Sequence, residues 1–206
     1  EPHAEVYGKV PEMTAWDLPT SLQVNDVQYA IRTDFRVVLD VLAAMNDPDL
    51  FEPDADEEEQ NYVRASVMLQ ILLEDYDSLP AGDYAEACEK AINFIDMGMK
   101  DDGKRKPHTM DWEQDAQIII PAINRVQGCE IRALPYLHWW SFLGAYMEIG
   151  DCLFAQVVNI RQKKQKHQKL EKWEREFYNA NRQIVDLRKK TGESQQREKA
   201  ALEKWL

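Results

Sequence analysis

The sequence has little that would support membrane insertion or metal chemistry. No apolar run reaches the ~18 residues that a bilayer-spanning helix needs, because Glu148 and Asp151 interrupt the best candidate. The 4 histidines are too scattered for a metal site, and the 3 cysteines lack metal-ligand spacing. We therefore expect no membrane partner and no metal. We interpret Cys88, Cys129 and Cys152 as small reduced core residues of a cytosolic protein.

Recognisable catalytic motifs are absent as well. The chain contains no phosphate-binding loop, dinucleotide-binding loop, nucleophile elbow or zinc-protease motif. No Ser or Cys has a recognisable nucleophile context. The first residues, from Glu1 onward, lack the basic and apolar segments of a secretory signal. We expect no enzymatic activity, no catalytic residues and no cofactor.

Charge is divided unevenly along a chain whose composition is ordinary for a globular protein, with 206 residues, 44% hydrophobic and 30% charged. Residues 1–150 carry 29 acidic and 11 basic side chains (net −18), whereas residues 151–206 carry 8 acidic and 14 basic ones (net +6). The acidic body argues against general nucleic-acid binding, which needs a positive face. The basic end is most simply a solvated helix, although it could bind nucleic acid or an acidic surface, including another copy's body.

A short hairpin is predicted to precede a series of helices. Apolar and polar residues alternate from Ser21 to Ile31 around a turn at Asn25-Asp26. Helical spacing then predicts helices over residues 35–45, from 54–59 through 73, and over 83–97, 111–127, 136–147 and 153–160, with residues 129–135 as a link. Thr33, Asp83 and Asp111 are the expected N-caps.

Two polar features of the body have competing interpretations. Asp111 and Asp115 share a helix face and could hold a cation or shift each other's pKa. We favour the simpler interpretation that they are acidic first-turn residues that complement the helix dipole. The polar stretch over residues 100–107 is the best candidate for an internal hinge.

The most concentrated apolar feature is Leu137-His138-Trp139-Trp140-Ser141-Phe142. Adjacent helical positions lie about 100° apart, so we expect one Trp ring in the core and the other against a second helix, a partner or a pocket rim. We interpret His138 as a buried imidazole hydrogen-bonded to a nearby acceptor.

The C-terminal segment carries an a/d heptad seam formed by Leu170, Trp173, Phe177, Ala180, Ile184 and Leu187. The seam is short for an autonomous coiled coil. Two interpretations remain open: the seam packs back onto the body as one more helix, or it accepts a partner helix.

An ordered set of segments carries a resemblance to a known family. In order they are Leu18-Pro19-Thr20, Val24-Asn25-Asp26, Tyr29-Ala30-Ile31, Thr33-Asp34-Phe35-Arg36, Phe94-Ile95 with Gly98, Asp111-Trp112-Glu113-Gln114-Asp115-Ala116 with Ile119, Leu137-His138-Trp139-Trp140-Ser141-Phe142, and Ile160-Arg161. This order resembles the "gene product fifteen" family of bacteriophage proteins, over about residues 17–190. One departure is local: family members often have a Tyr-Gly-Ile-Asp-like segment where this chain reads Gln127-Gly128-Cys129-Glu130-Ile131.

The resemblance implies a small protein of long-tailed phages and prophages of Gram-positive bacteria, encoded near the tape-measure gene. It implies a tail assembly chaperone or scaffold in the host bacterial cytoplasm that binds the helical tape-measure protein or other tail proteins. One alternative is a structural tail or connector component retained in the virion. A less favoured one is a regulatory nucleic-acid-binding protein that uses residues 161–172. The charge asymmetry also allows a head-to-tail homo-oligomer.

These patterns together predict a mainly α fold: a helical bundle with a short N-terminal β-hairpin and a basic C-terminal helical extension. Residues 1–16 would form a loose arm, residues 17–160 the body and residues 161–206 the extension. A chaperone for a coiled-coil client needs exposed apolar helix faces. As protein-contact residues we therefore single out Trp139, Trp140, Phe142, Leu170, Trp173, Phe177, Ile184 and Leu187.

Overall fold

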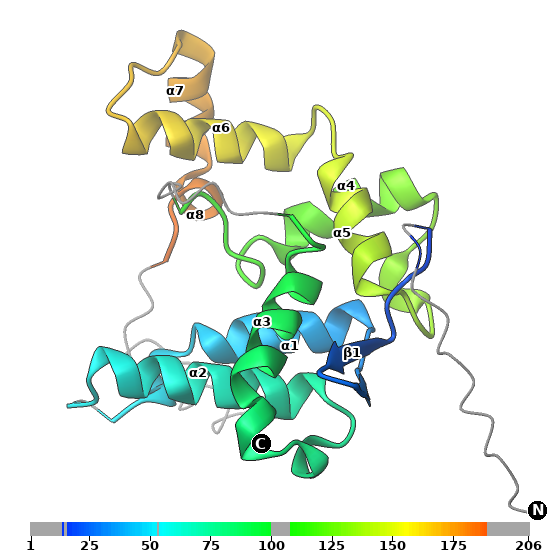
Figure 1. Ribbon diagram of the computed structural model, residues 1–206. Helices are drawn as coiled ribbons and strands as arrows, with labels where there is room; N and C mark the ends of the chain where they lie inside the picture. Colours follow the sequence, from blue (N-terminus) through cyan, green and yellow to red (C-terminus); the bar gives the residue numbers. More distant parts are fainter. Residues whose placement is uncertain (1–13, 15, 53, 100–107, 189–206) are drawn as a thin grey trace, which may run out of the picture.

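The computed structural model describes residues 14, 16–52, 54–99 and 108–188. Within these ranges the fold is mainly helical with one antiparallel hairpin, which confirms the predicted class (Figure 1). The elements in chain order are β1 (Ser21–Val24), β2 (Val27–Ala30), α1 (Phe35–Met45), η1 (Pro48–Leu50), α2 (Glu57–Leu72), η2 (Tyr76–Ser78), η3 (Ala81–Asp83), α3 (Tyr84–Ile95), α4 (Ala116–Gln127), η4 (Ile131–Ala133), α5 (Trp139–Met147), α6 (Leu153–Gln165), α7 (Lys172–Ala180) and α8 (Arg182–Val185). The elements η1 to η4 are single 3-10 turns.

The N-terminal hairpin forms where alternation predicts it. Val24 pairs with Val27 across the turn, and Asn25 adopts a φ of 51°, a left-handed conformation that Asn tolerates. The Asn25 side chain donates a hydrogen bond to Asp83 Oδ1 at 2.8 Å. This contact ties the hairpin to the start of α3, so the two strands do not stand alone.

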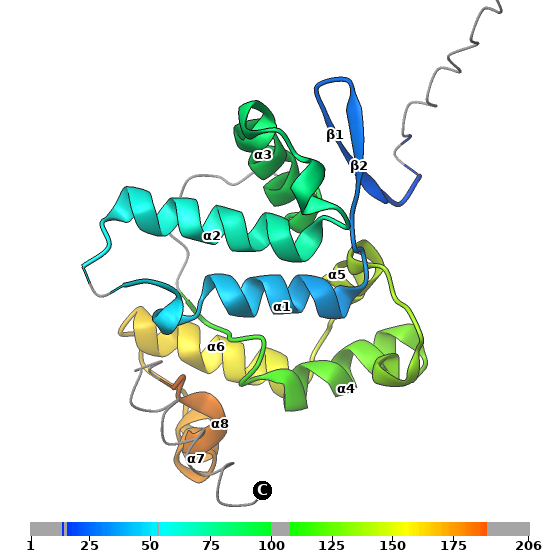
Figure 2. The same cartoon turned by 90° about the horizontal axis from the view of Figure 1, so that it is seen from below.

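The helices build one main core. In Figure 2, α1 and α2 lie side by side in opposite directions, and α3 and α5 pack against this pair. Met68, Leu69 and Leu72 of α2 share one helix face and are each at most 1% exposed. The core also takes in the hairpin, α4 and the first turn of α6. Among the described residues, no helix is long and apolar enough to cross a membrane.

The predicted cap of α1 is wrong by one residue. Asp34, not Thr33, is the N-cap: its backbone is extended and its carboxylate accepts the Arg36 N–H at 3.0 Å. The Thr33 hydroxyl is 2.7 Å from the Tyr136 hydroxyl, so it is engaged in a tertiary hydrogen bond instead. A longer-range partner therefore decides which of two adjacent capping residues is used.

The start of α4 also differs from the prediction. Asp111 Oδ1 accepts the N–H groups of Glu113 and Gln114, so Asp111 caps a turn, and α4 begins at Ala116. The predicted end is confirmed, because Gly128 closes α4 with a left-handed φ of 71°. Asp83 is the N-cap of α3, as predicted, but its side chain makes no capping hydrogen bond.

The structure corrects the prediction for Cys129, and two predicted segments lie wholly or largely outside the described residues. Cys129 is exposed rather than in the core, while Cys88 and Cys152 are half-buried. All three thiols are free. Of the predicted arm over residues 1–16 only Thr14 and Trp16 are described, and the predicted hinge over residues 100–107 lies outside the described residues.

Candidate protein-binding surfaces

The two adjacent Trp residues of α5 both donate a hydrogen bond to the end of α3. The indole N–H of Trp139 donates to Ile95 O, and that of Trp140 donates to Phe94 O, each at 2.8 Å. Both carbonyls lie in the last turn of α3, where the usual donor four residues further on is missing, although Phe94 O also accepts the Met97 N–H at 3.1 Å. Trp139 is 1% exposed, whereas Trp140 is half-buried. One ring is therefore in the core and its neighbour lies against a second helix, as expected.

Aromatic packing around Trp139 forms the centre of the main core. Phe142 stacks on Phe35 of α1 with 4.7 Å between ring centroids, and it also stacks on Trp139 at 5.5 Å. Trp112, from the turn before α4, contacts both Trp139 and Phe142. Trp139 and Phe142 are thus core residues, so the prediction that they form a contact surface does not fit this fold.

His138 has the structural role that its setting predicts. It is 3% exposed and caps α5: Nδ1 accepts the Trp140 N–H at 3.0 Å, and Nε2 lies 2.9 Å from Pro19 O. Because Nδ1 accepts, Nε2 carries the proton and donates to Pro19. This bond connects the segment before the hairpin to the aromatic cluster.

A buried ion pair that the sequence interpretation missed joins the C-terminal segment to the body. Arg161 Nη1 and Nη2 lie 2.6 and 2.8 Å from the two carboxylate oxygens of Asp115. The remaining guanidinium N–H groups donate to Thr109 O, Ile184 O and Val185 O. All five guanidinium donors are therefore used. Arg161 is not available to nucleic acid, and Asp115 is not a surface first-turn acid.

The C-terminal segment folds back as two short helices rather than one heptad helix. Asn181, with φ −129° and ψ 33°, separates α7 from α8. Glu174 and Val185, neither of which belongs to the predicted seam, are the buried residues of these helices. Val185 packs with Val157 and Ile160 of α6 in a small cluster of its own. The described part of the seam thus packs back onto the chain, out of the predicted register.

Polar contacts make Glu174 compatible with burial. Its Oε1 accepts Lys163 Nζ at 2.6 Å and Asn159 Nδ2 at 3.2 Å, and its Oε2 accepts the Glu171 N–H at 2.7 Å. Burial alone would raise the pKa of Glu174, but the hydrogen bonds from Lys163 and Glu171 outweigh it and hold the pKa below its ordinary value.

The predicted seam residues reach the surface to different degrees. Trp173 is 50% exposed and Ile184 is 37% exposed. Leu170 and Phe177 are half-buried against the α6–α8 cluster, Leu187 is half-buried and Ala180 is exposed. Trp173 is therefore the most accessible large apolar residue of the seam.

A comparison with known protein families identifies the family of this chain. A family model described as bacteriophage Gp15 protein matches residues 16–187, which include the hairpin, the aromatic cluster and the Arg161–Asp115 pair. The chain belongs to this bacteriophage protein family. No match was found among curated proteins or among solved structures.

The local departure from the family's pattern forms an ordinary helix end in this Gp15-family chain. Asn124 Oδ1 accepts the Ile131 N–H at 2.9 Å, and its amide donates to Glu130 Oε2 at 2.8 Å. Hydrogen bonds from the Arg132 side chain and backbone lower the pKa of Glu130 to about 2. The residues at this position thus build a stable turn after Gly128.

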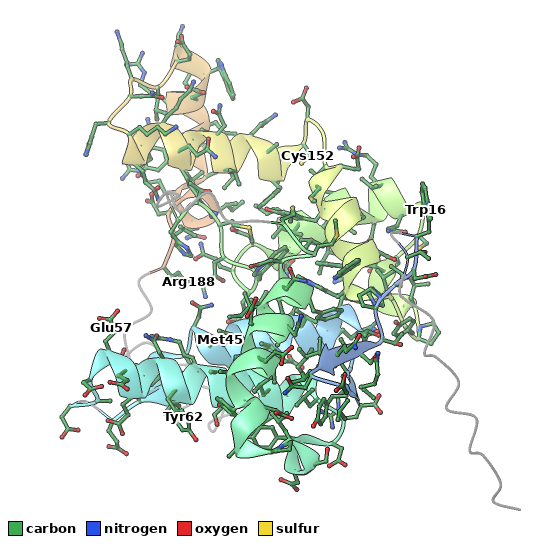
Figure 3. The ribbon with its side chains drawn as sticks, viewed as in Figure 1. Trp16, Met45, Glu57, Tyr62, Cys152 and Arg188 are labelled. Atoms are coloured by element: carbon green, nitrogen blue, oxygen red, sulfur yellow. The ribbon has the colours of Figure 1, made fainter. Side chains whose placement is uncertain are left out.

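A shallow groove lies on the surface between α4 and α6. It has a volume of about 200 Å³ and is lined by Gln117, Ile118, Pro121, Ala122, Arg125, Cys152 and Leu153. Pro121 has no N–H, so the Gln117 carbonyl lacks its usual helical donor there. Leu153, 42% exposed, forms part of the apolar lining. Figure 3 labels Cys152 at this end of α6.

The part of the chain that the structure describes contains no candidate metal site. No group of three His, Cys, Asp or Glu side chains there is placed to hold a metal ion. The Asp111–Asp115 alternative is also excluded, because both Asp115 oxygens bind Arg161. Among the described residues, the apolar groove and the exposed Trp173 of α7 are candidate contact surfaces.

Proposed function

We propose that this bacteriophage protein is a tail assembly chaperone or scaffold that binds a helical segment of the tape-measure protein. Family membership supplies the phage context. The structural observation that supports a binding role is the apolar groove between α4 and α6. An amphipathic helix can place its apolar residues in such a groove and leave its polar face in water.

The groove is a better client site than the aromatic cluster. Trp139 and Phe142 are buried in the core, so a client could reach them only if the fold opened. Ile118 and Leu153 already present apolar surface without any rearrangement. Of the contact residues predicted within α5, only Trp140 is half-buried rather than buried, and its indole N–H is already bonded to α3.

Co-expression with the tape-measure protein tests this function. We expect the client to become more soluble and to elute with the chain, and unchanged solubility and elution would contradict the proposal. Leu153→Asp should abolish co-elution, because it places a charge in the groove. Ile92→Asp is the matched control, since Ile92 is an exposed apolar residue on α3. It should leave co-elution intact.

The main alternative is a structural tail or connector component that stays in the virion. Mass spectrometry of purified particles separates the two functions. A chaperone should be absent from particles, whereas a structural component should be present in a fixed copy number. Ion pairs weaken the nucleic-acid alternative. Within the predicted binding segment, three cations are already paired with carboxylates: Arg161 with Asp115, Lys163 with Glu174 and Lys164 with Asp186.

A further inference from the structure

The outer face of α7, taken with the connection that leads into it, combines a positive net charge with an aromatic side chain. Lys166 and Lys169 of the connection and Lys172 and Arg175 of α7 are exposed, and none makes an ion pair with another described residue. Glu171 and Glu176 are exposed there too, so four cations and two carboxylates give this surface a net charge of +2. Trp173, 50% exposed, lies at the edge of this face. Accessible Trp and Arg side chains are enriched in protein–protein contacts.

The N-terminal end of α2 has the complementary character. Glu57, Glu58 and Glu59 occupy its first turn, are exposed and make no ion pair with a described residue. Tyr62 follows Glu58 and Glu59 by four and three residues, so it lies on the same helix face. It is 62% exposed. The acidic end thus also carries one accessible aromatic ring.

The two surfaces do not meet within one molecule. Figures 1 and 2 both show α7 and the free end of α2 in different parts of the structure. Figure 3 labels Glu57 at that end and Tyr62 further along the same helix, with no side chain of α7 beside them. Within the part of the chain that the structure describes, each surface is therefore accessible to a second molecule.

We propose that the outer face of α7 docks on the N-terminal end of α2 of a second copy of this chain. The acidic first turn would lie against Lys169, Lys172 and Arg175, with Trp173 and Tyr62 as the apolar part of the contact. Because the two surfaces differ, the contact is heterologous and leaves one of each surface free in a dimer. Repetition gives a ring where the rotation closes and a filament where it does not.

The proposal concerns self-association and does not depend on the α4–α6 groove or on a client. A contact rich in exposed charge pairs weakens as salt rises. Sedimentation velocity of the full chain should show oligomers at about 50 mM salt. The association constant should fall about tenfold or more by about 500 mM. A chain that stays monomeric at low salt, up to about 100 µM, overturns the proposal.

Charge reversal identifies the two surfaces. Lys169→Glu with Lys172→Glu, and separately Glu58→Lys with Glu59→Lys, should each give monomers at low salt, because like charges then face each other. Mixing the two variants should restore association, since each then offers the charge that the other requires. A mixture that stays monomeric overturns the proposed pairing, and circular dichroism of each variant confirms that it is folded.

A matched control separates this contact from a general charge effect. Asp75→Lys with Asp77→Lys makes the same charge change at exposed residues beyond the other end of α2. It should leave self-association within about twofold of wild type, and an equal loss would overturn the proposal. Nucleic acid is the other possible ligand of the α7 cations. A salt-dependent shift of duplex DNA by a monomeric wild-type chain, lost in Lys169→Glu with Lys172→Glu, would reassign this face.

Discussion

Arg161 of α6 and Asp115, the residue before α4, form a two-pronged ion pair that is almost completely buried, with side chains 4% and 1% exposed. The same guanidinium binds the last carbonyls of α8 and the carbonyl of Thr109. One side chain therefore joins α8, α6 and the segment that leads into α4. This arrangement fixes the folded-back position of the C-terminal helices.

Removing one partner of this pair should destabilise the protein strongly. Arg161→Met leaves the Asp115 carboxylate buried without its counter-charge, and we expect a loss of about 3–5 kcal/mol in the free energy of unfolding. Chemical denaturation of the full chain measures it. Arg132→Ala, which removes an exposed pair with Glu130, should change the free energy of unfolding far less, because water screens that pair.

A double-mutant cycle tests whether the two residues act as a unit. Asp115→Asn combined with Arg161→Met should be less destabilising than the two single changes added together, with a coupling of about 1–3 kcal/mol. Strict additivity would show that Arg161 acts only through the backbone carbonyls it binds.

The two Trp residues of α5 should differ in their contribution to folding. Trp139→Ala removes a fully buried ring and leaves the Ile95 carbonyl without its donor, so we expect a loss of about 3–5 kcal/mol. Trp140→Ala removes a half-buried ring and the bond to Phe94, and should cost about 1–3 kcal/mol. Equilibrium unfolding followed by near-ultraviolet circular dichroism compares them. Equal losses would contradict the assignment of Trp139 as the core ring.

Local patterns predicted most of the secondary structure correctly. The hairpin follows from strict alternation and an Asn-Asp turn, and the end of α4 follows from Gly128, because these signals lie within a few residues of their effect. The cap of α1 was missed by one residue because the Thr33 hydroxyl bonds Tyr136, which is 103 residues away. Neighbouring residues carry no sign of that bond.

The buried charges were missed for a similar reason, although a signal was present. Arg161 continues the apolar face of α6 set by Val157 and Ile160, at spacings of four and one. Glu174 likewise precedes half-buried Phe177 and Tyr178 by three and four residues. A charged residue in register with an apolar face indicates burial. The identity of the partner, 46 residues away for Arg161 and Asp115, depends on the fold.

The heptad interpretation failed because spacing alone does not set the direction of a helix face. Leu170, Trp173 and Phe177 fit the a/d pattern, but α7 ends before Asn181, and the buried residues of α7 and α8 are Glu174 and Val185. Trp173, one position before Glu174, is half-exposed. The surface proposed for self-association could therefore be recognised only with the structure.

Stability should fall in acid because several carboxyl groups have lowered pKa values in the folded state. Hydrogen bonds from Arg132 lower the pKa of Glu130 from 4.5 to about 2. For Glu174 and Asp186, burial acts to raise the pKa, but hydrogen bonds from Lys163 and Lys164 respectively outweigh it. The unfolded chain then binds more protons than the folded one. The stabilisation is fully present above pH ~4.5 and is lost as the pH falls toward ~2.

Glu174→Gln isolates one of these groups. The variant should be less stable than wild type at pH 7, because it loses the charged partner of Lys163. The difference should shrink as the pH falls below ~4.5, because Glu174 of the unfolded wild-type chain then binds a proton that the folded chain binds less readily. Urea denaturation at pH 7, 4.5 and 3 measures the difference, with Glu176→Gln, an exposed carboxylate on the same helix, as the control. A stability gap between Glu174→Gln and wild type that stays constant over this range would mean that the carboxylate charge of Glu174 does not contribute to folding.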